Sequence, residues 1–169
     1  MNRIVPAVLA CCVPMLFPTG TSASEERFLD SLAGDYAGQG QVRLRTDRKP
    51  ITVSCTFAST TSGDSLSLKG RCRGLVVVSR AVGVDLKVSG GTYRGSYIGA
   101  GSGPASLSGR RKGEALNLTI GWAKKVNGDR RANLSVAKAG NDGLTLTTTD
   151  RDPSSGKMVT TSRITLQRR

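Results

Sequence analysis

The sequence predicts an all-β fold: a single antiparallel up-and-down β-barrel of about 8–11 strands, preceded by a short N-terminal helix. Apolar and polar residues alternate with period two from residue 36 onward, and this is the side-chain period of a β-strand. Clusters of Gly, Asn, Asp and Pro separate these runs at short, regular intervals, as in hairpin-linked barrels and sandwiches. No run after residue 34 has the period of an amphipathic helix.

The first 23 residues are expected to be a secretory signal peptide. Met1-Asn2-Arg3 is a positive start, Ile4–Phe17 carries no charge, and small residues precede a cleavage point between Ala23 and Ser24. The apolar run is shorter than the roughly 20 residues that span a bilayer. We therefore expect an exported protein, periplasmic or extracellular, with one domain from 24 to 169 and no transmembrane segment in the mature chain.

A short helix is predicted directly after the leader. Glu25 and Glu26 suit its first turn, and Gly34 ends it. Its apolar stripe consists of Phe28, Leu29 and Leu32.

The alternating runs give the expected strands. They cover residues 36–44, 51–57, 66–72, 82–88, 92–98, 105–109, 116–122, 132–136, 144–149 and 158–166. The segment Leu75–Ser79 is apolar on both parities, which predicts that it is covered on both faces.

Two cysteines remain once the leader and its Cys11 and Cys12 are removed. An exported chain with an even number of cysteines is expected to pair them. If Gly63-Asp64 is a two-residue turn, Cys55 lies directly opposite Cys72, and both fall on the apolar parity of their strands. We therefore predict a largely buried disulfide that stabilises the fold by roughly 3 kcal/mol.

Glycines recur on the apolar parity of the strands. They are Gly38, Gly40, Gly70, Gly95 and Gly109. Two interpretations stay open: the missing side chains leave a cavity inside the barrel, or they let the strands bend and approach closely.

The segment FLDSLAGDYAGQGQVRL, Phe28 to Leu44, resembles the opening of lipocalin-like (calycin) barrels, especially the nitrobindin-like group. In these a short helix leads into a strand with a Gly-x-aromatic-x-Gly motif, here Gly34 to Gly38 around Tyr36. The resemblance implies that a basic residue near the chain end, Arg163 or Arg168, crosses Tyr36. The chain departs from the group because Tyr36 replaces the usual tryptophan. It also has no histidine to ligate haem.

The charge of the mature chain is strongly positive. Without Arg3, 24 of the 25 Lys and Arg residues face 12 Asp and Glu residues, and the charges are scattered. A solvated surface is the plainer interpretation, although such a chain is also attracted to anionic polymers and lipid head groups. Nucleic-acid binding is not expected, because the compartment disfavours it and few aromatics are present for base stacking.

No enzyme, metal site or cofactor is expected. The chain has no histidine, the commonest general base and metal ligand, and it has no Gly-x-Ser-x-Gly motif. Asp150 and Asp152 beside Pro153 indicate a turn rather than a calcium loop, because the ligand spacing of a calcium site is missing.

Three functional hypotheses follow. The first is an exported barrel that binds a small apolar or amphipathic ligand in its interior. The second is an envelope interaction or structural module whose basic surface contacts anionic polymers or a partner protein. A periplasmic hydrolase is the third, and no motif marks it. The candidate lining of the ligand cavity is Tyr36, Phe57, Tyr93, Tyr97 and Trp122.

Overall fold

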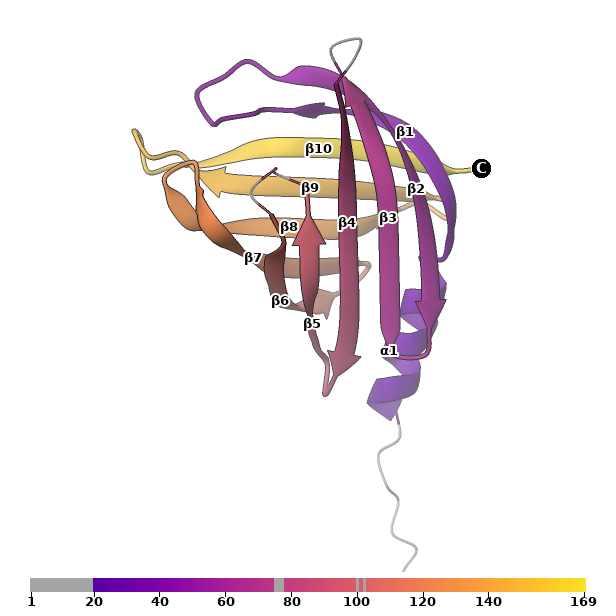
Figure 1. The fold of residues 1–169 in the computed structure, drawn as a ribbon. Coiled ribbons are helices and arrows are strands. Elements are labelled where there is room, and N and C mark those ends of the chain that lie inside the picture. Colours follow the sequence, from indigo (N-terminus) through magenta and orange to yellow (C-terminus); the bar gives the residue numbers. More distant parts are fainter. Residues whose placement is uncertain (1–19, 75–77, 100, 102) are drawn as a thin grey trace, which may run out of the picture.

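A computed structural model describes residues 20–169, apart from 75–77, 100 and 102 (Figure 1). It contains one helix, α1 (Gly20–Asp30), and ten strands. The strands are β1 (Gly34–Val42), β2 (Ile51–Ser62), β3 (Ser65–Gly74), β4 (Val78–Ser89), β5 (Thr92–Ile98), β6 (Ala105–Lys112), β7 (Ala115–Val126), β8 (Asp129–Ala139), β9 (Gly143–Arg151) and β10 (Met158–Arg168). Most of the predicted leader lies outside the described residues.

Each strand pairs antiparallel with the next, and β10 returns to pair with β1. The sheet is therefore a closed up-and-down barrel, as predicted. In Figure 1, β2, β3 and β4 cross the direction of β8, β9 and β10 steeply. The inward-facing side chains of all ten strands form one core.

Local sequence explains why these strands form and where they turn. In β2, inward Val53, Cys55 and Phe57 alternate with exposed Thr and Ser residues, so one face is buried and the other is solvated. The turn after β7 has positive φ at both Asn127 and Gly128, 50° and 83°. Positive φ at both central residues is the requirement of the type I′ hairpin, whose twist matches that of the strands.

Helix α1 closes one end of the barrel, where Phe28, Leu29 and Leu32 are buried in the core. The helix begins at Gly20, before the predicted start at Glu25, so the predicted cleavage point lies inside it.

Tyr36 and Arg168 tie the chain end to this helix. The Tyr36 hydroxyl donates to the Leu32 carbonyl, and the Arg168 guanidinium lies 5.4 Å from the Tyr36 ring centroid. Arg168 also donates to the carbonyl oxygens of Ser31 and Ala33. Of the two basic residues predicted to cross Tyr36, the structure therefore selects Arg168.

The inward glycines serve close approach of the strands. A Cβ on Gly38 would lie 1.9 Å from the carbonyl oxygen of Thr165, and one on Gly95 would lie 1.8 Å from that of Asp85. No side chain fits at such distances. The same contact with a neighbouring backbone oxygen recurs at Gly40, Gly70 and Gly109. These glycines thus allow the sheet to bend, and they are not evidence of a cavity.

Two expectations about apolar residues are wrong. Leu44 shares the apolar parity of Tyr36 in the predicted strand 36–44, which places it inside, but it is 64% exposed because β1 ends at Val42. Val78 is 44% exposed and Ser79 is also exposed, so this part of Leu75–Ser79 is not covered on both faces. The first residues of β4 pair with β3 alone, beyond the point where β5 joins. Residues 75–77 lie outside the described part of the chain.

The predicted disulfide is confirmed. Cys55 and Cys72 are directly opposite each other in the β2–β3 ladder, with their Cα atoms 4.1 Å apart and their sulfur atoms bonded. Both are buried in the core.

Replacing both cysteines with alanine should lower the free energy of unfolding by about 3 kcal/mol, because the unfolded chain loses a constraint. Urea unfolding measures the change, and reduced wild-type protein, the control, should show a similar loss. Thiol labelling of the denatured, unreduced wild type should find no free cysteine at 55 or 72; two labelled sites would contradict the bridge.

Candidate functional site

The five predicted cavity residues lie at two opposite ends of the barrel. Tyr36, Phe57 and Tyr93 face inward near α1, which we call the closed end. Tyr97 and Trp122 face inward at the opposite end, which we call the mouth. The structure therefore does not bring all five together around one site.

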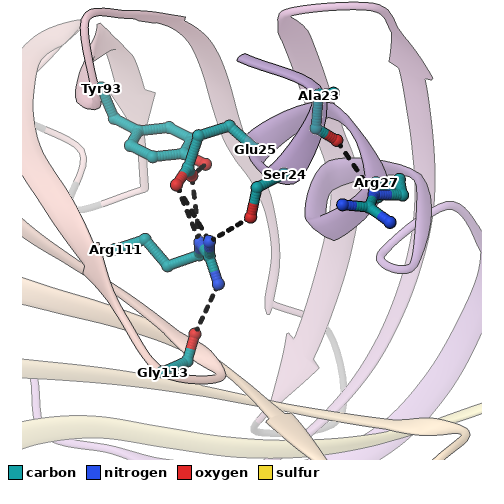
Figure 2. A network of polar contacts seen from close by, with 7 residues as sticks. All are labelled: Ala23, Ser24, Glu25, Arg27, Tyr93, Arg111 and Gly113. Atoms are coloured by element: carbon teal, nitrogen blue, oxygen red, sulfur yellow. Dashed lines mark hydrogen bonds and ion pairs between the residues drawn. The ribbon is translucent and has the colours of Figure 1, made fainter. Parts of the chain in front are cut away.

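The closed end is held by a polar network around Glu25 of α1 (Figure 2). Arg111 Nε donates to both carboxylate oxygens of Glu25, at 3.1 and 3.0 Å, and its Nη2 adds a third bond at 3.0 Å. The Tyr93 hydroxyl donates to the same carboxylate. The hydrogen bonds from Arg111 lower the pKa of Glu25, while burial and this carboxylate raise the pKa of Tyr93 far above its usual value.

The remaining groups of this network are also paired. Arg111 donates to the Ser24 hydroxyl and the Gly113 carbonyl, and its guanidinium lies 4.8 Å from the Phe28 ring centroid. Ser24 and Glu25 follow the predicted cleavage point, so the expected mature chain would retain both residues. With its charge balanced and its donors used, this network fixes the helix to the barrel. Ser59, which pairs with Gly34 at the same end, keeps a buried hydroxyl without a hydrogen-bond partner.

The mouth is bordered by apolar side chains that are only partly buried. They are Val42, Ile51, Val82, Tyr97 and Val126. Each comes from a different strand, and four of them lie at or next to the strand end remote from α1. The core is therefore sealed by α1 at one end and incompletely covered by its own side chains at the other.

Trp122 and Tyr97 meet inside the mouth, edge to face, with ring centroids 5.7 Å apart. Burial raises the pKa of the Tyr97 hydroxyl to about 12, and the nearby Asp150 carboxylate adds to the shift. Trp122 Nε1 is buried without a hydrogen-bond partner.

Asp150 lies in the interior beside these rings, and its assignment to a turn was wrong. In β9 the buried side chains alternate as Leu144, Leu146, Thr148 and Asp150, so the inward face changes from apolar to acidic towards the mouth. Opposite it, the register between β9 and β10 shifts at Thr161, and this bulge directs the Thr161 side chain inward. The Thr161 hydroxyl donates to Asp150 Oδ2.

The Asp150 carboxylate is poorly compensated. Burial raises its pKa; Thr161, Asn127 and Trp122 oppose the rise, and Asp129 adds to it. Although Trp122 lies close enough to have this effect, both its Nε1 and Asp150 Oδ1 lack a partner with hydrogen-bond geometry. An unmade bond of a buried polar group costs about 1–3 kcal/mol.

Three loops join at the rim of the mouth. Thr46 lies in the loop between β1 and β2. Its backbone N–H donates to Asn127 Oδ1 at 3.3 Å, and its hydroxyl donates to Asp152 Oδ1 at 2.9 Å. Asp152 also accepts bonds from Ser154 and Ser155, and these bonds hold its pKa well below the usual range. Asp152 thus organises the turn after β9, as predicted.

Sequence reasoning missed Asp150, Thr148 and Thr161 as interior residues. A signal for the first two was present, because they share the parity of Leu144 and Leu146. Thr161 gave no such signal, since a bulge changes the parity of the strand.

Across the described residues, no group of three or more Cys, Asp or Glu side chains is placed to hold a metal ion. Within the same part of the chain, the helix found is too short and too polar to cross a bilayer.

Replacing Glu25 with Gln should lower the free energy of unfolding at pH 7 by about 1–3 kcal/mol, because Arg111 loses its charged partner. Glu26→Gln, at the neighbouring, partly exposed position, is the control and should have little effect. Since the pKa of Glu25 is lowered, its stabilisation is present above pH 4.5 and is lost as the pH falls through the lowered value. A difference between wild type and Glu25→Gln that persisted undiminished in strong acid would contradict this assignment.

Replacing Asp150 with Asn should change the pH dependence of stability. Because the pKa of Asp150 is raised, the folded protein holds this proton more tightly than the unfolded chain does. Wild type should therefore lose stability relative to Asp150→Asn as the pH rises from about 3.8, until the raised value is passed. Urea unfolding from pH 3 to 8 measures the difference, with exposed Asp35→Asn as the control; parallel curves would refute the prediction.

Comparison with known proteins supports the fold. A scan of protein-family models and a search of curated protein sequences find no match. Among solved structures, Rv2717c from M. tuberculosis is similar, with a TM-score of 0.67, 18% sequence identity, and coverage of 85% of this chain and 96% of that one. The structure of EF1p2_mFAP2b bound to DFHBI aligns with a TM-score of 0.46 and 9% identity over 86% and 99% of the two chains. At this level of identity, the first likeness shows the fold alone, a closed antiparallel barrel, which has ten strands in this chain.

Proposed function

We propose that this chain is an exported, non-enzymatic lipocalin-like barrel that binds a small amphipathic ligand at its mouth. The observation that carries the proposal is the difference between the two ends of one core. At the closed end every polar group of the Glu25 network is paired, α1 covers the apolar residues, and one hydroxyl, that of Ser59, is unpaired. At the mouth the apolar border is partly exposed, and Trp122 and Asp150 keep unpaired polar atoms.

Such a combination suits an amphipathic molecule. Ligand sites are mostly apolar, with a few polar groups that fix orientation. Here Val42, Ile51 and Val82 would contact the apolar part of the ligand, and Trp122 and Asp150 would meet its polar part. The disulfide agrees with the expected oxidising compartment. The nitrobindin-like resemblance remains a prediction, without haem, because the chain has no histidine.

The test uses Nile red, an uncharged apolar dye, and a matched pair of variants. Ile51→Arg places a charge in the border of the mouth and should weaken dye binding at least about tenfold. Leu44→Arg adds the same charge nearby, at a position that is already exposed, and should leave binding unchanged. Dye fluorescence measures both affinities.

Salt and the native ligand provide two further outcomes. Binding in the interior should persist in 1 M salt, because it does not depend on surface charge. Native mass spectrometry of the protein from its own envelope should show a bound small molecule. No saturable dye binding together with a ligand-free mass spectrum would overturn the proposed function.

A second candidate, an interaction with anionic polymers, is favoured by one observation on the outer face. Arg71 and Arg73 of β3 border a shallow hollow of about 460 Å³ over β1–β3, together with Gln39, Ser54 and Thr56. Within the described part of the chain, neither arginine forms an ion pair with a carboxylate. This hypothesis predicts that polyanion binding fades in high salt and is weakened by Arg71→Gln with Arg73→Gln.

A further inference from the structure

The strongest unassigned feature is the pair of unsatisfied atoms inside the mouth. Asp150 is 3% exposed and Trp122 is 5% exposed, so bulk water does not solvate either side chain freely. Thr161 donates to Oδ2 of the carboxylate, and Oδ1 has no partner with hydrogen-bond geometry, although the donors of Trp122 and Asn127 lie close enough to lower the pKa of Asp150. The indole N–H of Trp122 has none either. A carboxylate oxygen can only accept a hydrogen bond when ionised, so its missing partner must be a donor.

Among the described residues, no cation influences Asp150. The groups that influence it are Thr161 of β10, Asn127 of the β7–β8 turn, Trp122 of β7, Tyr97 of β5 and Asp129 of β8. Four of these are uncharged at neutral pH, and Asp129 is acidic. None of the ion pairs among the described residues includes Asp150. In this respect the mouth is the opposite of the closed end, where Arg111 neutralises Glu25.

The apolar border decides what kind of donor can approach. Partly buried aliphatic and aromatic side chains, among them Ile51 and Tyr97, pack against this core. A hydrated inorganic cation would gain nothing from that border. A head group attached to an apolar tail would use both features. An anionic head group, such as that of a fatty acid, would face a buried carboxylate without a counter-ion and be repelled.

We infer that the mouth selects amphipathic amines: a protonated amino group donates to Asp150 Oδ1 while the apolar tail lies against Trp122, Tyr97 and the border of the mouth. This inference rests on the proposed function and names the chemistry of its ligand. It also runs against the net charge of the whole protein, +13, which attracts anions to the surface. Surface adsorption and binding in the mouth therefore predict opposite orders of affinity.

The experiment compares three probes with the same tail: octylamine, which is protonated at pH 7, uncharged octanol and anionic octanoate. Trp122 is the only tryptophan of the chain, so its fluorescence reports binding at the mouth without a label. We expect octylamine to bind wild type at least about tenfold more tightly than octanol, and octanoate to bind most weakly. In Asp150→Asn the preference for octylamine over octanol should fall to about threefold or less, and in Asp35→Asn, the exposed control, it should be unchanged.

The outcomes separate this inference from the proposed function. Equal binding of the three probes, or tightest binding of octanoate, would overturn the amine preference and leave a ligand-binding barrel in place. Binding of none of them, with no binding of Nile red, would overturn the proposed function itself. An amine preference that Asp150→Asn retains would also overturn the inference. The order of the three affinities for wild type needs no variant, so it tests the amine preference even if Asp150→Asn fails to fold.

Discussion

The pairing of β1 with β10 is the contact on which the rest of the structure depends. It removes both edges of the sheet, and every strand must then place alternate side chains in one shared interior. The closed sheet has close backbone approaches at Gly38 and Gly95 that no side chain would permit. Closure also fixes two ends, and these ends carry different chemistry.

Two buried acids show the difference. Glu25 comes from a helix outside the barrel, and Arg111 reaches it from β6, so its burial is compensated by charge-assisted hydrogen bonds. Asp150 belongs to the wall itself and has one hydroxyl partner. Folding alone gains nothing from the second arrangement, because an unpaired buried group destabilises the native state. Such local cost is typical of binding sites, where a ligand completes the missing interactions.

The outer surface and the interior of this barrel also differ in the sign of their charge. Basic residues are spread over the outer surface, and the interior near the mouth is acidic. Salt should therefore weaken the attraction of anions to the outer surface more than the binding of a ligand in the interior. Surface potentials are screened over about 10 Å, whereas a buried contact is screened much less. This difference in salt dependence distinguishes an amphipathic ligand bound in the interior from an anionic polymer bound to the surface.

The sequence by itself determined the fold class, the disulfide and most strand positions, because period-two alternation and hairpin turns are local properties of the chain. The Cys55–Cys72 pair followed from counting outward from Gly63-Asp64. Only the tertiary structure decided that Tyr36 and Tyr93 lie at one end of the barrel and Tyr97 and Trp122 at the other. It also decided that Asp150 lies beside Trp122 in the interior and that Thr161 turns inward at a bulge. These contacts join residues far apart in sequence, and they depend on the register of strands that meet only when the barrel closes.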